Sequence, residues 1–178
     1  MNERPHALSD DQKKSVSACN IQVDIVVESG KWDAFGAVDG VVRSVADAIS
    51  NALELDDDAQ LSLALSDDER VGELNHTFRG KSGATNVLSF PAPVDTVGDA
   101  KSRYIGDVIL ACETLLREAE AANVSGLDHF RHLLVHGILH LLGYDHDTDA
   151  QARKMERLEA RILGTLGVSD PYEALNAQ

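Results

Sequence analysis

Apolar residues recur along this chain with two different periods, one of two residues and one of three to four, which are typical of strands and helices respectively. Ile21–Val27 alternates and is rich in β-branched residues, whereas Val38–Leu53 places its apolar side chains on one helical face. The pattern predicts strands at 21–27, 61–65, 86–90 and 104–111, the last of them central, and helices at 38–53, 68–78, 113–122, 127–142 and 148–166. This order predicts an α/β fold with a mixed sheet of about four strands and about five helices.

The same pattern sets the domain organisation. Residues 1–20 are polar and unpatterned, so we expect a flexible tail there, one domain over 21–172, and a short C-terminal tail at 173–178. The first residues have no apolar h-region and no run reaches about 18 apolar residues, so we expect neither a signal peptide nor membrane association. Cys19 and Cys112 have no CxxC partner and are typical of free thiols in a reducing compartment, which predicts a cytoplasmic protein.

Charge narrows the classes of partner. The formal net charge is −14 and the sequence pI is about 4.7. Such a surface repels nucleic acid at long range and counts against a protein that coats RNA broadly. An enzyme that contacts a few phosphates through a local basic patch and a metal remains compatible with this charge.

The strongest chemical signal is the segment from His136 to His146, which contains histidines at 136, 140 and 146. Two histidines four residues apart lie on one face of a helix and can bind one metal ion. Gly143 can end that helix in a left-handed conformation and let the chain return with His146 as a third ligand. Three protein ligands with one open position are typical of catalytic zinc, so we predict one Zn²⁺ per chain.

His129 and His132 extend the histidine face of this helix, whose remaining circumference is mostly apolar. Buried imidazoles need partners, so we expect these two to be hydrogen-bonding or substrate-side groups. They are also the alternative ligands should His146 not reach the metal.

Two residues next to the predicted ligands, Gly137 and Asp145, bear on the type of zinc site. Zinc proteases of the H-E-x-x-H type place a glutamate as general base after the first histidine, where this chain has Gly137. Gly137 would instead permit close approach of a neighbouring element or a substrate, or serve as a packing contact. Asp145 could orient an imidazole or simply stabilise the turn, and the sequence leaves both open.

A second group of residues lies in the loop that begins at Arg79. Arg79 and Lys81 are cations in an acidic chain, and Ser82, Gly83 and Thr85 follow them. Such a loop can bind an anion through side chains and backbone N–H groups. Composition alone favours a surface loop with two solvated cations, and spacing does not tell whether it meets the histidines.

Taken together, the segments Arg79–Pro91, Gly106–Ile109 and His136–His146 resemble the YbeY family of metal-dependent bacterial endoribonucleases. The resemblance extends over roughly Leu61 to Tyr172, with Ala84 where the family often has proline. It implies a small α/β domain with one zinc bound by the three histidines that correspond to His136, His140 and His146.

The resemblance also implies a substrate and further site residues. The family cleaves single-stranded RNA in ribosomal RNA maturation, especially at the small-subunit 3′ end, and in ribosome quality control. Arg79 would be a functional residue in a cleft over the metal. From the matching segments we assign Lys81 and Ser89 to substrate binding as well, and Asp107, with Asp145, to the support of the metal ligands.

A mechanism built from the residues agrees with that implication. Zinc lowers the pKa of a bound water to about 7, which makes that water a nucleophile, and Arg79 would neutralise the charge that develops on phosphate. The RNA 2′-hydroxyl is an alternative nucleophile. A zinc-dependent peptide or amide hydrolase and a non-catalytic zinc-stabilised binding module are the rival functions. Because the chain is so acidic, we expect a ribosome-associated protein partner to bring it to RNA.

Overall fold

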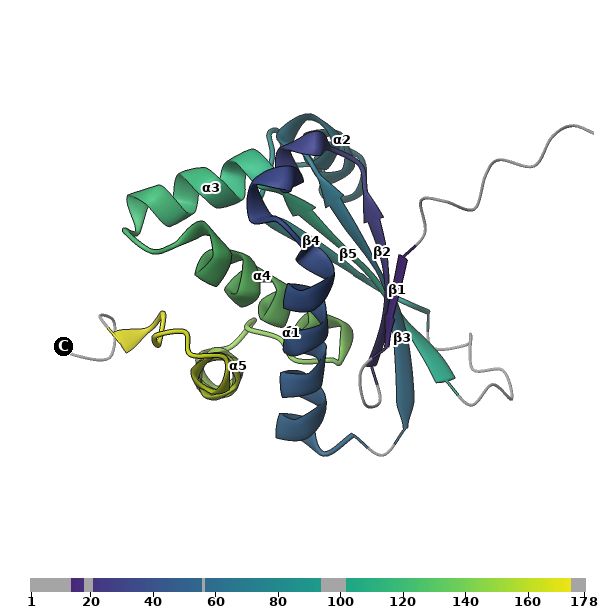
Figure 1. Ribbon diagram of the computed structural model, residues 1–178, viewed down its shortest axis with the longest axis vertical. Helices are drawn as coiled ribbons and strands as arrows, with labels where there is room; N and C mark the ends of the chain where they lie inside the picture. Colours follow the sequence, from purple (N-terminus) through teal and green to yellow (C-terminus); the bar gives the residue numbers. More distant parts are fainter. Residues whose placement is uncertain (1–13, 18–20, 56, 94–101, 174–178) are drawn as a thin grey trace, which may run out of the picture.

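The computed structural model describes residues 14–17, 21–55, 57–93 and 102–173, and these form one mixed five-stranded sheet with helices on both faces (Figure 1). The strand order is β1-β2-β3-β5-β4. The strands are β1 (Lys14–Ser17), β2 (Ile21–Val27), β3 (Asp58–Ser66), β4 (Val87–Pro91) and β5 (Ser102–Ala111). β2, β3 and β5 run parallel, and β1 and β4 pair antiparallel at the two edges. The predicted α/β class with a mixed sheet is confirmed.

The helices are unequally shared between the two faces of the sheet. They are η2 (Gly30–Phe35), α1 (Val38–Leu53), α2 (Asp68–Arg79), α3 (Cys112–Ala121), α4 (Gly126–Leu141) and α5 (Asp149–Thr165). Figure 1 shows α1, α4 and α5 together on one side of the sheet. On the other face, α2 packs through Val71 onto a small cluster with Leu88 and Ala111. None of the helices in the described ranges is long and apolar enough to cross a membrane.

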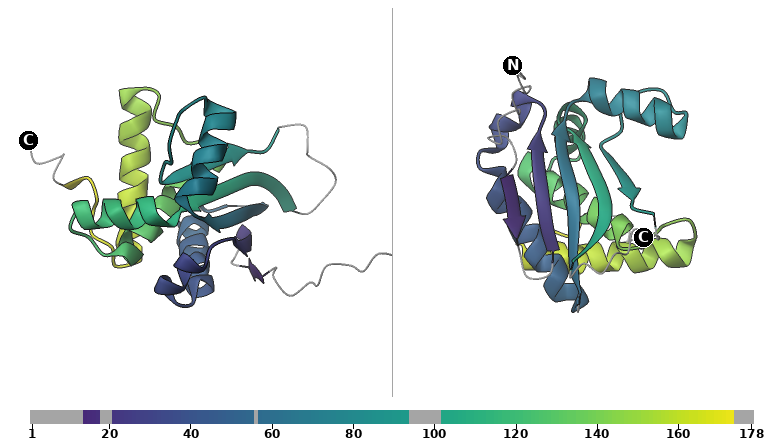
Figure 2. Two further views of the ribbon diagram at one scale, coloured as in Figure 1. Left: turned by 90° about the horizontal axis from the view of Figure 1, so that it is seen from above. Right: turned by 90° about the vertical axis from the view of Figure 1, so that its right-hand side faces the viewer.

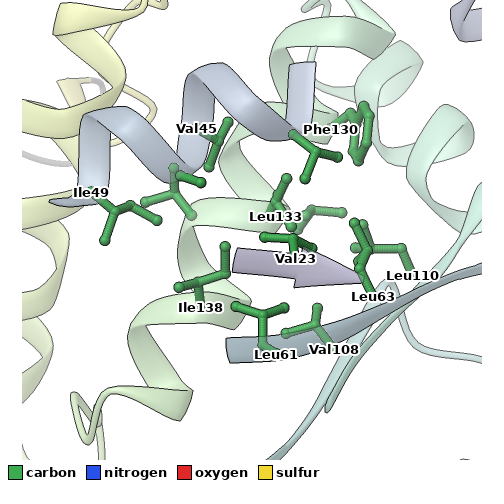
Figure 3. Packing of buried hydrophobic residues seen from close by; sticks show 14 of the residues in the cluster. Val23, Val45, Ile49, Leu61, Leu63, Val108, Leu110, Phe130, Leu133 and Ile138 are labelled. Carbon is green, nitrogen blue, oxygen red and sulfur yellow. The ribbon is translucent and has the colours of Figure 1, made fainter. Parts of the chain in front are cut away.

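The main core lies between α1, α4 and the sheet, and it holds α4 in place. In Figure 3, Leu133 and Ile138 of α4 lie among side chains from α1 and from the central strands. Both residues are buried, as are Val45 and Leu61 on either side of them. Because α4 is apolar around most of its circumference, burial fixes its position, and its histidines project from a rigid element.

Three features differ from the pattern-based expectations. The strand β1 lies within the segment expected to be a tail, and β3, not β5, is the middle strand. The short helix η2 was not predicted from periodicity. It is held by Trp32, which is 1% exposed and donates from Nε1 to the carbonyl of Ser66 at 2.8 Å. A single buried aromatic residue produces no periodic pattern, so hydrophobic periodicity does not predict this short helix.

Candidate metal centre

The end of α4 turns the chain sharply and brings His146 back towards the helix. Gly143 has a φ of 90°, a left-handed conformation in which side chains are strained. Its N–H donates to the carbonyl of His140 at 3.1 Å, and the N–H of Tyr144 donates to that of Leu139 at 3.0 Å. These two bonds form a Schellman motif, which satisfies the last carbonyls of the helix. Helix α5 then starts at a capping box between Thr148 and Gln151.

The three predicted ligands meet at this turn. One ring nitrogen from each of His136, His140 and His146 lies within 4.8 Å of the others. The ring centroids are 4.5 Å apart for His136 and His140, and 5.0 Å apart for His140 and His146. His136 and His140 are half-buried, whereas His146 is exposed. A metal at this point would be anchored on the helix and open to solvent on the side of the loop.

Hydrogen bonds orient the two helical imidazoles for a cation. Nδ1 of His136 lies 2.7 Å from Oε1 of Glu159, and Nδ1 of His140 lies 3.0 Å from the carbonyl of Tyr144. Both partners are acceptors, so each neutral ring carries its proton on Nδ1 and presents a lone pair at Nε2. These two Nε2 atoms are only 3.0 Å apart. Two facing lone pairs repel one another, and a metal ion between them satisfies both.

The electrostatics also favour the neutral ligand form. Burial and the neighbouring imidazoles of His136 and His146 lower the pKa of His140 below its usual value. Metal ions bind the neutral imidazole, so a lowered pKa keeps His140 ready to bind at neutral pH.

Glu159 contacts the histidine cluster from another helix, and no motif in the sequence predicts it. It lies on α5 with 1% exposure. Tyr172 donates its hydroxyl to Oε2 of Glu159, and His132 Nε2 lies 3.6 Å from the same oxygen. Burial opposes ionisation, but bonds from His132, His136 and Tyr172 lower the pKa of Glu159 to about 2. A glutamate in the buried stripe of α5, among Met155, Leu158, Ile162 and Leu163, is the sequence signal that could have marked it.

The remaining helical histidine, His129, also makes a hydrogen bond outside the cluster. Its Nε2 lies 2.8 Å from Oε2 of Glu118, which also accepts from the amide of Asn86 at 2.8 Å. His129 therefore links α4 to the start of β4, and His132 supports Glu159. Neither ring belongs to the ligand cluster.

A cleft of about 680 Å³ opens over the histidines. Arg79, the last residue of α2, lines it together with the three histidines, and so does Ser89 of β4. The rest of the wall is Thr85, Asn86, Val87, Pro91, Leu141, Gly143, Tyr144, Asp145 and Asp147. Lys81 is exposed in the loop and is not among the lining residues. The structure thus brings Arg79 and Ser89, but not Lys81, to the predicted ligands.

Comparison with known proteins agrees with this arrangement. A model of the family "Endoribonuclease YbeY" matches residues 27–167. The chain belongs to the YbeY family. It is 42% identical to endoribonuclease YbeY of Bartonella henselae, over 88% of this chain and 99% of the relative. It is 46% identical to endoribonuclease YbeY of Maricaulis maris, over 84% of this chain and 91% of the relative. The resemblance inferred from the sequence is confirmed.

The fold is shared more widely than these sequence relatives. A solution structure of the Thermotoga maritima protein TM1509 matches with a TM-score of 0.53 at 22% sequence identity. The match covers 84% of this chain and 97% of that one. The similarity concerns the fold and extends over nearly all of the described core.

Gly137, the position that distinguishes this YbeY-family motif from that of zinc proteases, is a packing contact. A Cβ atom here would lie 2.9 Å from Cγ1 of Val108 and 3.2 Å from Cγ2 of Val87. Ser89 donates its hydroxyl to the carbonyl of Gly137 at 3.0 Å. The missing side chain lets α4 lie directly on β4 and β5, so neither a substrate nor a glutamate fits at this point.

The two aspartates assigned to ligand support lie in different places. Asp145 accepts the N–H of His146 at 2.7 Å, and this bond lowers the pKa of the carboxyl. That contact corresponds to the turn-stabilising role. Asp107 lies on β5 and accepts the hydroxyl of Tyr104 at 2.7 Å. It lines a separate hollow with Phe78 and Phe90, so the structure does not bring it to the histidines.

Proposed function

We propose that this protein is a zinc-dependent endoribonuclease that cleaves phosphodiester bonds of single-stranded RNA. The observation that carries the proposal is the convergence of Arg79 with His136, His140 and His146 in one open cleft of a YbeY-family fold. Metal ligands and a guanidinium facing the same space are the parts that phosphate chemistry requires.

The donor set fits zinc. Three neutral imidazoles, two of them oriented by Glu159 and by the carbonyl of Tyr144, are a common ligand set for catalytic zinc. When bound there, zinc would polarise a phosphoryl oxygen and lower the pKa of water. The residues of the chain would hold the three imidazole rings, shape the cleft and present its polar wall to the substrate.

Arg79 has the role of binding the phosphate that reacts. Its guanidinium is always charged and can form two parallel hydrogen bonds with phosphate oxygens. Because Arg79 ends α2 at an exposed position, its side chain can follow the phosphate as charge develops on it. Thr85 and Asn86 line the same wall and offer further polar groups for the RNA backbone.

We further propose ribosomal RNA as the substrate, with action at the small-subunit 3′ end and in ribosome quality control in the cytoplasm. The motif resemblance supports this assignment, and the names of the relatives support the broader class of endoribonuclease. A net charge of −14 gives the protein little general attraction to RNA. A ribosome-associated protein partner would therefore supply part of the targeting.

Metal analysis combined with RNA cleavage tests the proposal. Wild type, Arg79→Ala and the matched control Arg70→Ala, on the same helix but outside the cleft, should each bind about one zinc per chain, and His140→Ala should lose it. Cleavage should be lost in His140→Ala and fall about a hundredfold or more in Arg79→Ala, with Arg70→Ala unchanged. If His140→Ala and Arg79→Ala both cut as well as wild type, the activity is a contaminant and a zinc-stabilised binding module is favoured.

A further inference from the structure

Helix α5 carries a group of cations on an otherwise acidic protein. Arg153, Lys154, Arg157 and Arg161 are all exposed, and they represent four of the 16 lysines and arginines of the chain. Within the described part of the chain, no ion pair engages any of the four. In the right-hand view of Figure 2, α5 lies across the lower end of the molecule, near the last turns of α1.

Three of these cations line one hollow together with an aromatic ring. A hollow of about 420 Å³, here named the Tyr144 hollow, is lined by Leu53, Tyr144, Lys154, Arg157, Leu158 and Arg161. Lys154 Nζ lies 5.4 Å from the centroid of the Tyr144 ring. No carboxylate is among the residues that line this hollow. Its positive charge is therefore available to an anion from outside.

Tyr144 connects this hollow to the metal cleft. The same residue lines the cleft above the histidines, and its carbonyl accepts from Nδ1 of His140. A polymer that leaves the cleft on this side passes an aromatic ring and then reaches Lys154 and Arg157. An aromatic ring followed by cations is the combination that binds single-stranded nucleic acid without reading its sequence.

The neighbouring surface of α5 is less suited to an anion. Arg153 and Arg157 also line a second hollow, but Glu156 and Asp170 share it and offset their charge. Arg161 donates to the carbonyl of Ala52 at 2.9 Å and is thereby tied to the end of α1. Arg157 donates from Nε to the carbonyl of Arg153 at 3.0 Å, which leaves its two terminal nitrogens and the ammonium of Lys154 for phosphate contacts.

We propose that the RNA strand flanking the cleaved bond leaves the metal cleft over Tyr144 and enters the Tyr144 hollow, where Lys154 and Arg157 contact its phosphates. This inference rests on the proposed function for the identity of the cleaved bond, and it adds where the substrate extends. It explains how a protein of net charge −14 retains RNA at its site, because the cations are concentrated along one exit.

The test uses the full-length zinc-loaded protein and a fluorescein-labelled single-stranded RNA of about ten nucleotides, with fluorescence anisotropy measured over a range of salt concentrations. The double variant Lys154→Gln/Arg157→Gln should bind about tenfold more weakly, and the slope of log K against log salt should fall by about 1.4 for two lost phosphates. The control Arg43→Gln/Arg70→Gln makes the same change of charge at exposed positions that line neither the cleft nor the Tyr144 hollow, and should bind as wild type does. Tyr144→Leu removes the aromatic ring and should weaken RNA binding while zinc is retained. Tyr144→Phe keeps the ring and should bind RNA as wild type does.

The outcomes separate the inference from the proposed function. If wild type cleaves RNA and the Lys154/Arg157 variant binds and cleaves equally well, the path along α5 is overturned and the nuclease assignment stands. If wild type does not cleave but binds RNA in a manner that depends on Lys154 and Arg157, the path stands and the nuclease assignment fails. Absence of RNA binding by wild type at low salt would overturn both. Equal displacement of RNA by polyaspartate of the same length would assign the hollow to acidic proteins and overturn the RNA path.

Discussion

Glu159 Oε1 lies 2.7 Å from Nδ1 of His136, and this contact connects α5 to the first of the three clustered histidines. The two residues are 23 positions apart in the chain, and the carboxylate is buried on a different helix. Tyr172 and His132 hold the second oxygen of Glu159. The orientation of His136 therefore depends on the docking of α5 and of the segment that follows it.

Replacement of Glu159 should weaken metal binding even though Glu159 does not touch the metal. Glu159→Gln removes the charge that keeps the proton on Nδ1 of His136, and the loss of such a supporting group lowers metal affinity about 10- to 100-fold. Zinc affinity measured by competition with a chelator checks this. Glu156→Gln, at a half-buried position one turn away on α5, makes the same change of charge without removing a contact to His136; it is the control and should bind zinc like wild type. Unchanged affinity in Glu159→Gln would show that packing alone orients His136.

Gly143 should be required for the third ligand. With φ at 90°, a β-branched residue at this position is strained by about 1–2 kcal/mol. Gly143→Val should therefore lower the free energy of unfolding by that amount and weaken zinc binding, because the strained turn no longer delivers His146. Gly143→Asn should lose less, since asparagine tolerates the left-handed region. Urea denaturation and zinc titration distinguish the two, and equal loss in both variants would point to a cause other than backbone conformation.

The sequence predicts best those helices and strands that bury one regular face. The ranges Ile21–Val27 and Val38–Leu53 match β2 and α1 to the residue, because each has a regular buried face. The clustering of His136, His140 and His146 could be predicted for a related reason, since helical spacing and one glycine place them within a short segment.

Contacts between distant segments could not be predicted in this way. The partners of Glu159 come from α4 and from Tyr172. The hydrophobic periodicity of a single element gives no information on such contacts between elements. The motif around Gly106 predicts Asp107 at the site, yet strand alternation directs Val108 towards the core and Asp107 towards the opposite face of the sheet. The matching segment that contains Arg79 likewise predicts Lys81 at the site, but Lys81 is not among the residues that line the cleft.

Replacing a helical glycine by alanine should have opposite effects on stability at Gly137, which contacts the sheet, and at Gly164, which does not. Gly137→Ala would place Cβ 2.9 Å from Val108 and should lower the free energy of unfolding by about 1–3 kcal/mol. Gly164→Ala on α5 meets nothing within 4 Å and should raise it by about 0.5 kcal/mol, because alanine favours the helix. Urea denaturation of both variants tests this. Stabilisation by Gly137→Ala would mean that β4 and β5 can move away from α4.

The buried thiol of Cys112 should be unreactive in the folded protein. Cys112 is 0% exposed at the start of α3, and burial, aided by the charge of Glu113, raises the pKa of its thiol to about 11. At pH 8 the thiolate is then about 0.1% of the total, and it is shielded from solvent. A Cys19→Ser variant leaves Cys112 as the only thiol. Its reaction with a disulfide reagent should be at least a hundredfold slower in the folded protein than in the same protein unfolded in urea, because both the thiolate fraction and the access of the reagent are lower in the folded state. Rapid reaction in native buffer would show instead that the start of α3 opens from the sheet, and the rate would then measure that opening.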